Sequence, residues 1–327
     1  MKNYKILDTT LRDGGYCNNW NFSEELTFTI VNELNKANID YIECGIIKPT
    51  VLGTSNSLLF PSMREISLFY SSFSCRDKLV CLVNYGEITL KALNYNKQDR
   101  ILKVRVAFYK KDMNSALSFC LELMNMGYQV FVQPMAISSY SKNERIILFK
   151  EIEKISPYAF YVVDSFGCLV GEELIELFNT LDSIMPSVVK LGFHGHTNLG
   201  QENSILNALY NNIWYHEIII DGTINGIGRG AGNIRTERLC SIKGKGFQQE
   251  KLNEICHEIF SGSHSHKQPQ EIFYWSAIYK CHPNYASFFY SHNLDFLHFS
   301  KCLKALSEIG IDEYDEKIAL EIMKDLI

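Results

Sequence analysis

Residues 188–200 read VVKLGFHGHTNLG, and this stretch shows the unit from which the fold is built. Its apolar first half predicts a strand, and the spacing of apolar residues from Asn198 onward predicts a helix. His194 and His196 lie at the end of the strand, where residues two apart point to the same face. Two adjacent imidazoles can bind a divalent metal, although histidine pairs also form hydrogen bonds in protein cores.

The same alternation of strand, loop and helix repeats along the chain. Eight β-rich runs are expected, at 4–10, 39–46, 78–84, 101–109, 128–138, 159–167, 188–193 and 216–224. Helices are expected from Ser23, after the fourth run to about Met126, at 142–155, at about 171–185 and in 198–211. A doubly wound sheet uses the same alternation, but eight similarly spaced units favour an α/β fold of the (β/α)8 TIM-barrel type.

Beyond about residue 245 the strand pattern ends. Residues 251–260, 284–306 and 315–327 have helical spacing instead. We therefore expect a TIM-barrel catalytic domain at 1–245 and a helical C-terminal extension at 246–327.

Composition excludes several classes of protein. The chain has 327 residues, 46% of them hydrophobic and 21% charged, with a net charge of −5, which argues against a general nucleic-acid binder. It contains no apolar run long enough to cross a membrane and no signal-peptide pattern, so we expect a cytoplasmic protein. Its ten cysteines are scattered and form no C-x-x-C pair, so neither a disulfide framework nor a cysteine zinc site is expected.

Polar residues occur where the predicted strands end, the position of catalytic groups in TIM barrels. They are Arg12 and Asp13 after the first strand, Glu43 on the second, Asp164 and Ser165 on the sixth, His194 and His196 on the seventh, and Asn233 after the eighth. One carboxylate, two imidazoles and an amide oxygen suit Mn²⁺, Mg²⁺, Zn²⁺ or a similar ion with open coordination positions.

Each of these residues also has an ordinary structural role to consider. Arg12 is either a surface arginine or a group facing an anionic oxygen, with Glu43 as its partner. Asp164 and Ser165 are suitable helix caps, and Asn233 is a suitable cap after a glycine-rich loop. Their joint occurrence at strand ends favours an active site.

The loop GIGRGAGN, residues 226–233, resembles a dinucleotide-binding fingerprint. That fingerprint normally opens the first strand–helix–strand unit, whereas this loop follows the last strand, so dinucleotide binding is not favoured. Its backbone N–H groups remain suited to an anionic group of a substrate.

The motifs LDTTLRDGG, DYIECG, VVDSFG, FHGHTNLG and DGTINGIGRGAGN, spread over residues 4 to 240, resemble the DRE-TIM metallolyase superfamily. Its Asp-Arg-Glu trio corresponds to Asp13, Arg12 and Glu43. The resemblance implies that Asp13, His194 and His196 hold the metal, with Asn233 as a further ligand. It also implies that Arg12 faces an enolate oxygen and that Ser165 contacts the carboxylate or carbonyl of the substrate.

Within this superfamily the chain is most similar to the 4-hydroxy-2-oxovalerate aldolase branch. The resemblance implies a lyase that cleaves or forms a 4-hydroxy-2-keto acid through a pyruvate enolate, with a 2-keto acid and an aldehyde as its small-molecule partners. Mn²⁺ or Mg²⁺ is the expected cofactor, with Zn²⁺ or Co²⁺ as alternatives, and a homodimer is left open. An acyl-CoA/2-keto acid synthase and a non-catalytic binding barrel are the alternative functions.

The chain departs from these aldolases where a proton must be moved. Tyr16 replaces the histidine that serves there as the base, and Tyr109 replaces a second histidine. We expect Tyr16 to take part in catalysis. The stretch CHPNYASFFYSH offers His282 and Tyr285 as substrate-binding groups if it covers the barrel mouth; the alternative is an aromatic helix packed on the barrel.

Overall fold

The computed structural model describes residues 4–50, 57–244, 246–261 and 268–326, and its centre is a closed parallel barrel. Eight strands form the barrel in the order β1-β9-β8-β7-β6-β5-β4-β2, and β1 pairs with β2 to close it. They are β1 (Tyr4–Asp8), β2 (Tyr41–Ile47), β4 (Leu79–Asn84), β5 (Lys103–Phe108), β6 (Gln129–Pro134), β7 (Ala159–Asp164), β8 (Lys190–Gly195) and β9 (Ile218–Gly222). A two-residue strand, β3 (Leu59–Phe60), adds to β2 outside the ring. The predicted TIM barrel is confirmed.

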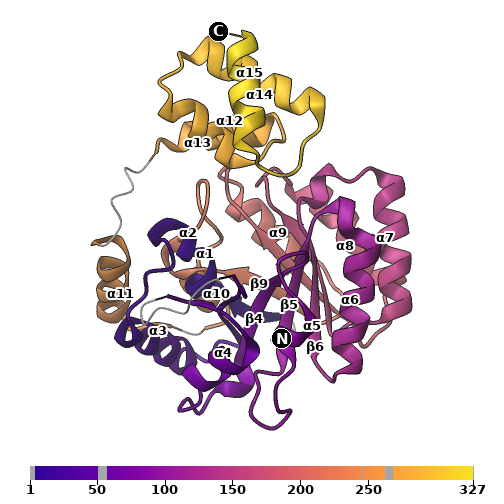
Figure 1. The fold of residues 1–327 in the computed structure, drawn as a ribbon, viewed down its shortest axis with the longest axis vertical. Coiled ribbons are helices and arrows are strands. Elements are labelled where there is room, and N and C mark those ends of the chain that lie inside the picture. The colour runs from indigo at the N-terminus through magenta and orange to yellow at the C-terminus, as the bar shows by residue number, and fades with distance from the viewer. Residues whose placement is uncertain (1–3, 51–56, 245, 262–267, 327) are drawn as a thin grey trace.

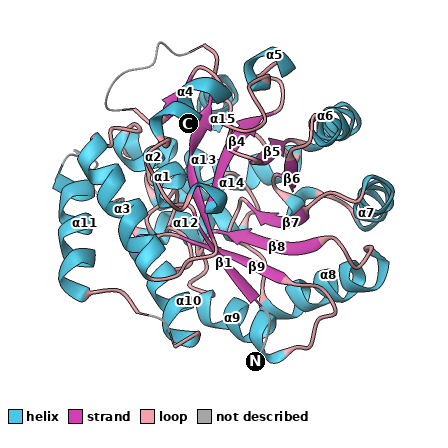
Figure 2. Ribbon diagram, turned by 90° about the horizontal axis from the view of Figure 1, so that it is seen from below, coloured by secondary structure: helices cyan, strands magenta, loops and turns pink. Residues whose placement is uncertain are grey.

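Helices surround the barrel, as Figure 2 shows from below. The main ones are α3 (Glu24–Lys36), α4 (Met63–Phe69), α6 (Met113–Asn125), α7 (Lys142–Ile155), α8 (Gly171–Ile184), α9 (Glu202–Asn211) and α10 (Thr236–Ile242). Short helices also occur at α1 (Thr10–Asp13), α2 (Gly15–Asn18) and α5 (Leu90–Leu93). None of the described helices is long and apolar enough to span a membrane.

Local sequence explains where several helices begin. The Ser23 side chain accepts a hydrogen bond from the Leu26 N–H at the start of α3. Ser141 and Glu144 form a reciprocal capping box at the start of α7. Both predicted starting points are therefore confirmed.

Five helices follow the barrel. α11 (Gln249–Ser261) packs on the barrel, with Leu252, Ile255 and Ile259 in the main apolar core. The other four are α12 (Gln270–Ile278), α13 (Pro283–Ser291), α14 (Phe296–Ile309) and α15 (Glu316–Leu326), and they share a separate apolar core. They form the orange-to-yellow group beside the barrel in Figure 1. The predicted domain boundary falls on residue 245, outside the described residues, and stays a prediction.

The C-terminal helices are attached to the loops at the carboxyl ends of the strands. Ala277 of α12 packs with Ala136, Phe166 and Cys168, which follow β6 and β7. Ala231, in the loop after β9, packs against the core of α12–α15. These helices therefore cover part of the barrel mouth, where TIM-barrel active sites lie.

Several predictions of where a strand ends were wrong, as three examples show. The first strand ends at Asp8, and residues 10–13 form a helical turn because the Thr9 carbonyl accepts from the Arg12 and Asp13 N–H groups. Glu43 lies within β2 rather than at its end. The fifth strand ends at Pro134, and Ile137–Ser139 form a 3-10 turn. In the fifth run, the apolar pattern continued past Pro134, the last residue of the strand.

Asp8 is a buried acid that links the end of β1 to α10. It accepts hydrogen bonds from the Thr236 hydroxyl at 2.5 Å and from the Thr10 N–H at 2.9 Å. Burial nevertheless raises the pKa of Asp8 to about 7. The folded protein therefore holds this proton more tightly than the unfolded chain does.

We predict that Asp8 stabilises the fold most below about pH 4, where it is protonated in both states, and that this contribution is lost as the pH rises through about 7. Asp8→Asn stays neutral throughout. In urea unfolding, the stability of the native protein relative to this variant should fall from pH 4 to pH 7. A difference that does not change with pH would show that Asp8 does not titrate in this range.

Candidate metal centre

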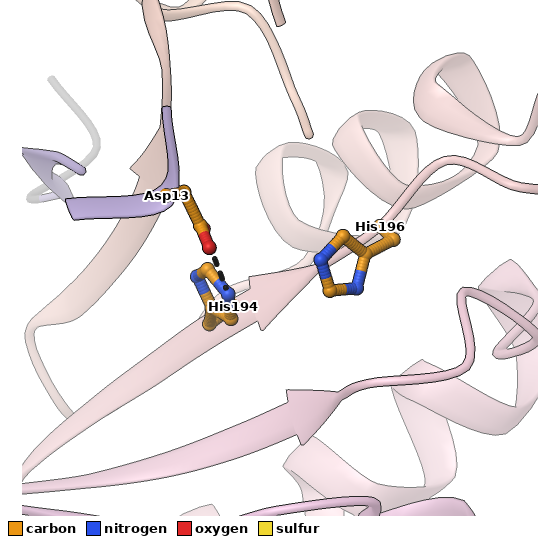
Figure 3. Close-up of side chains that lie close together, drawn as sticks. All are labelled: Asp13, His194 and His196. Atoms are coloured by element: carbon orange, nitrogen blue, oxygen red, sulfur yellow. Dashed lines mark ion pairs between the residues drawn. The ribbon is translucent and has the colours of Figure 1, made fainter. Parts of the chain in front are cut away.

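Asp13, His194 and His196 meet at the carboxyl end of the barrel (Figure 3). Asp13 ends the helical turn after β1, His194 lies in β8, and His196 follows that strand. One ligand atom from each of the three lies within 4.8 Å of the others, and all three residues are buried. Carboxylate and imidazole groups in this arrangement are suited to a divalent metal.

Several polar atoms at this group lack a partner. Both ring nitrogens of His196 and the Oδ1 atom of Asn233 are buried without a hydrogen bond to any residue that the structure describes. The Asn233 amide nitrogen donates to Asp13 at 3.1 Å, so the Asn233 side chain is held beside the other three. Unpartnered buried polar atoms are costly. These unpartnered nitrogen and oxygen atoms have lone pairs that can coordinate a divalent ion. The residues therefore fit such an ion.

The candidate ligands belong to a closed ring of buried hydrogen bonds and ion pairs. Its members, in order around the ring, are Asp13, Arg12, Glu43, Arg105, Asp221 and His194. On one side, the Arg12 guanidinium pairs with Asp13 through Nη1 and with Glu43 through Nε, at 2.8 Å from the Glu43 carboxylate. Arg12 is thus the predicted partner of Glu43, and both side chains are buried.

The other side of the ring runs through Arg105 and Asp221. Arg105 Nη1 lies 3.1 Å from Glu43, and Arg105 Nη2 lies 2.5 Å from Asp221. Asp221 Oδ2 lies 2.9 Å from Nδ1 of His194, whose Nε2 faces Asp13 at 3.3 Å. A carboxylate at Nδ1 fixes the orientation of the imidazole and leaves Nε2 to serve as the metal ligand.

The surroundings of Asp13 and His196 shift their pKa values so that both can bind a cation at neutral pH. Burial raises the pKa of Asp13, but the charge of Arg12 and the nearby imidazoles outweigh burial and hold it well below its usual range. Burial also lowers the pKa of His196 to about 3, against the opposing charge of Asp13. Asp13 is therefore ionised and His196 is neutral, which are the forms that bind metals.

Residues 102–256 match the family described as HMGL-like. The 4-hydroxy-2-oxovalerate aldolase of Geobacillus thermodenitrificans is 26% identical over 78% of this chain and 75% of its own length. The oxaloacetate decarboxylase of Mycobacterium tuberculosis is 26% identical over 72% and 68%. A solved N-terminal domain from Bacteroides vulgatus, assigned as an aldolase, superposes with a TM-score of 0.70 at 25% identity and covers 88% of this chain and 97% of that domain.

The chain resembles the DRE-TIM metallolyase superfamily, and the family match and these relatives support that resemblance. The resemblance in the motifs is thereby confirmed, and the chain is an enzyme of the lyase class, as these relatives are. The superfamily generally uses a divalent metal, and Asp13, His194 and His196 offer a place for one.

Tyr16, where this chain departs from the aldolases, lies close to the centre. The Arg229 guanidinium stands over its ring at 4.0 Å, and Trp20 packs edge-on at 4.6 Å. Tyr109, the second departure, is also near, because its pKa responds to the charge of Arg229 and to Tyr16, although burial is the main cause of its rise to about 12.

The predicted substrate-binding residues have different surroundings. The Ser165 hydroxyl accepts a hydrogen bond from the Ala136 N–H at 2.9 Å. His282 caps α13 and is buried; burial lowers its pKa, and the charge of Arg229 lowers it further. The Tyr285 hydroxyl instead donates to the Glu313 carbonyl and accepts from the Asp315 N–H. Tyr285 therefore stabilises the C-terminal helices, and we assign it no role at the site.

Sequence reasoning missed Arg105 and Asp221. Each lies in an otherwise apolar strand, β5 and β9, and each is buried. Charged residues in such strands are seldom buried without partners, and this signal was available in KVRVAF and IIIDG. Their partnership across the barrel interior was not visible, because the two residues are 116 positions apart.

We predict that His196→Ala abolishes stoichiometric metal binding and leaves the barrel folded, since His196 makes no hydrogen bond through its ring in the described structure. Elemental analysis after dialysis against Mn²⁺ measures the loss, and circular dichroism checks the fold. His292→Ala, which removes the exposed histidine that follows α13, is the control and should keep its metal. Full metal content in His196→Ala would overturn the assignment.

Asp221→Asn should weaken Mn²⁺ binding about 10- to 100-fold, because the neutral amide no longer holds the His194 imidazole in place as a carboxylate does. Calorimetric titration measures the affinity. Asp182→Asn is a matched control, since Asp182 makes the same contact with His216 at 2.7 Å outside the site. Equal affinity in both variants would mean that Asp221 only pairs with Arg105.

Proposed function

We propose that the protein is a divalent-metal-dependent aldolase that cleaves or forms a 4-hydroxy-2-keto acid through a pyruvate enolate. The observation that carries the proposal is the juxtaposition of Asp13, His194 and His196 with the buried Arg12 guanidinium, which pairs with Asp13. A bound divalent ion would polarise the keto acid's carbonyl group and stabilise negative charge on its oxygen. The aldolases among the relatives support the choice of reaction.

Arg12 is suited to face the developing enolate oxygen. Its Nη1 atom pairs with Asp13 and its Nε atom with Glu43, so the guanidinium plane is held from two sides. Its Nη2 atom has no hydrogen-bond partner within the described ranges. A donor that is positioned before the reaction stabilises a developing oxyanion without the cost of reorganisation.

Glu43 acts by positioning Arg12. The Glu43 carboxylate contacts both Arg12 and Arg105 and is buried among them, so it is a counter-charge that keeps two guanidinium groups in place. Its Oε1 atom has no partner among the residues described. We do not assign Glu43 to a proton transfer, since its carboxylate is already paired with two guanidinium groups.

The proton on the aldol hydroxyl requires another group, and we propose Tyr16. Its ring is held between Arg229 and Trp20 beside the centre. His282 is the neighbouring candidate, but its Nδ1 atom accepts from the Asn284 N–H. In a neutral imidazole the other nitrogen then carries the proton, so His282 is suited to donate a hydrogen bond to the substrate.

The test separates enolate formation from carbon–carbon bond cleavage. Without aldehyde, the Mg²⁺-loaded enzyme should exchange the methyl protons of pyruvate for deuterium, as followed by NMR. Arg12→Lys should slow this exchange by roughly 10²–10³, because lysine does not reproduce the planar guanidinium. Tyr16→Phe should slow cleavage of 4-hydroxy-2-oxovalerate more than it slows exchange.

Metal titration and thermal unfolding of each variant control for loss of the site or the fold. Near-native exchange in Arg12→Lys would mean that Arg12 is structural. No exchange in the native enzyme, together with calorimetric binding of acetyl-CoA, would favour the acyl-CoA synthase instead. Failure with a broad panel of keto acids and aldehydes would favour a binding protein.

A further inference from the structure

A large cavity lies beside the candidate metal centre. Its volume is about 1240 Å³, and it lies between the glycine-rich loop after β9 and helices α12 and α13. Tyr16 and Asn233 line it, but Asp13, His194 and His196 do not. Because Asn233 contacts Asp13 directly, the cavity adjoins the centre without containing the metal ligands.

The size of this cavity indicates a ligand larger than pyruvate. Pockets of about 300–1,000 Å³ bury ligands the size of a drug molecule, and this one is larger. A keto acid bound by the metal ligands would lie at its edge, next to Asn233. The remaining space therefore suits the second substrate, the aldehyde.

Arg229 is a cation without a counter-charge on the wall of this cavity. Its guanidinium lies over the Tyr16 ring, and its Nε atom is buried without a partner in the described part of the chain. No carboxylate among the described residues forms an ion pair with it. Its charge nevertheless reaches Asp13 and His196, which places it between the cavity and the centre.

The backbone around Arg229 adds further donors. The N–H groups of Gly228, Arg229 and Gly230 have no hydrogen-bond partner in the described structure, whereas the next N–H, of Ala231, donates to Asn198 Oδ1 at 2.8 Å. Gly230 has a φ of +66°, a conformation that glycine adopts readily. Consecutive free N–H groups next to a guanidinium are suited to bind an anion.

The acidic residues on the cavity wall do not neutralise this group. Glu202 pairs with Arg238 at 2.9 Å and accepts from the Arg235 N–H. Glu271 is solvent-exposed in the first turn of α12. An anion from the substrate is therefore the counter-charge that Arg229 lacks.

We propose that Arg229 and the N–H groups of residues 228–230 bind an anionic group, a carboxylate or a phosphate, carried by the aldehyde that combines with the keto acid. This inference rests on the proposed aldolase function. It assigns the substrate class: an aldehyde whose anionic group lies away from its reacting carbon. Arg229 is then a specificity-determining residue that does not serve the metal.

Matched pairs of aldehydes test the proposal in condensation with pyruvate. Succinic semialdehyde and butanal differ by a carboxylate, and glyceraldehyde 3-phosphate and glyceraldehyde differ by a phosphate. The native enzyme should prefer the anionic member of at least one pair, and that pair identifies the anion. Arg229→Gln should lower kcat/KM for the preferred anionic aldehyde about 10- to 100-fold more than it lowers the value for its neutral partner.

Two further variants serve as controls. Arg235→Gln removes the same charge from another part of the cavity wall and should have little effect. Arg229→Lys should restore part of the preference, because it retains the charge. Equal losses for anionic and neutral aldehydes, or no preference in the native enzyme, would overturn the proposal. So would a rise in KM for pyruvate in the deuterium exchange of Arg229→Gln, since Arg229 would then bind the keto acid.

A binding measurement separates this inference from the proposed function. Inorganic phosphate and succinate are titrated into the Mg²⁺-loaded native protein and into Arg229→Gln. If phosphate or succinate binds in a way that depends on Arg229, but the enzyme does not exchange the methyl protons of pyruvate, the anion site is supported and the aldolase function is overturned. If the enzyme exchanges the methyl protons of pyruvate, but neither anion binding nor a preference for anionic aldehydes depends on Arg229, the aldolase function is supported and the anion site is overturned.

Discussion

A buried ring of charges holds the active end of this barrel together. Three carboxylates and two guanidinium groups, joined through one imidazole, contact one another in a closed circuit with almost no exposure to water. Removing one member of a buried ion pair leaves an uncompensated charge, which typically costs about 3–5 kcal/mol. Because carboxylates outnumber guanidinium groups, the ring also favours a cation at the position where Asp13 and the two histidines meet.

The ring depends on barrel closure. Its members come from the turn after β1 and from strands β2, β5, β8 and β9, which lie on different sides of the barrel. Only a closed parallel barrel directs all of them to one interior point. The rigid strands then hold His194 and Arg12 in fixed relative positions, as a centre that stabilises developing charge requires. The C-terminal helices add the wall of the neighbouring cavity, which the barrel alone does not form.

Much of the architecture could be predicted from local patterns. The alternation of apolar strands with helical segments predicted eight barrel strands, because each strand is buried on both faces and each helix on one. The capping residue Ser23 marked the start of a helix because its hydrogen bond reaches only three residues along the chain. Asp13, His194 and His196 could be chosen as a group because strand ends in such a barrel share one face.

The sequence by itself thus determined the type of fold and the residue types of the centre, whereas the tertiary structure decided which groups meet. Arg105 and Asp221 become partners through barrel closure, and Glu43 lies within its strand, between two arginines, rather than at the strand's end. The Tyr285 hydroxyl bonds to the Glu313 carbonyl within the C-terminal helices, although its sequence position allowed a place at the barrel mouth. Local periodicity reports which face of an element is buried, but contacts between distant elements depend on strand register and on the docking of the C-terminal helices, which no short stretch encodes.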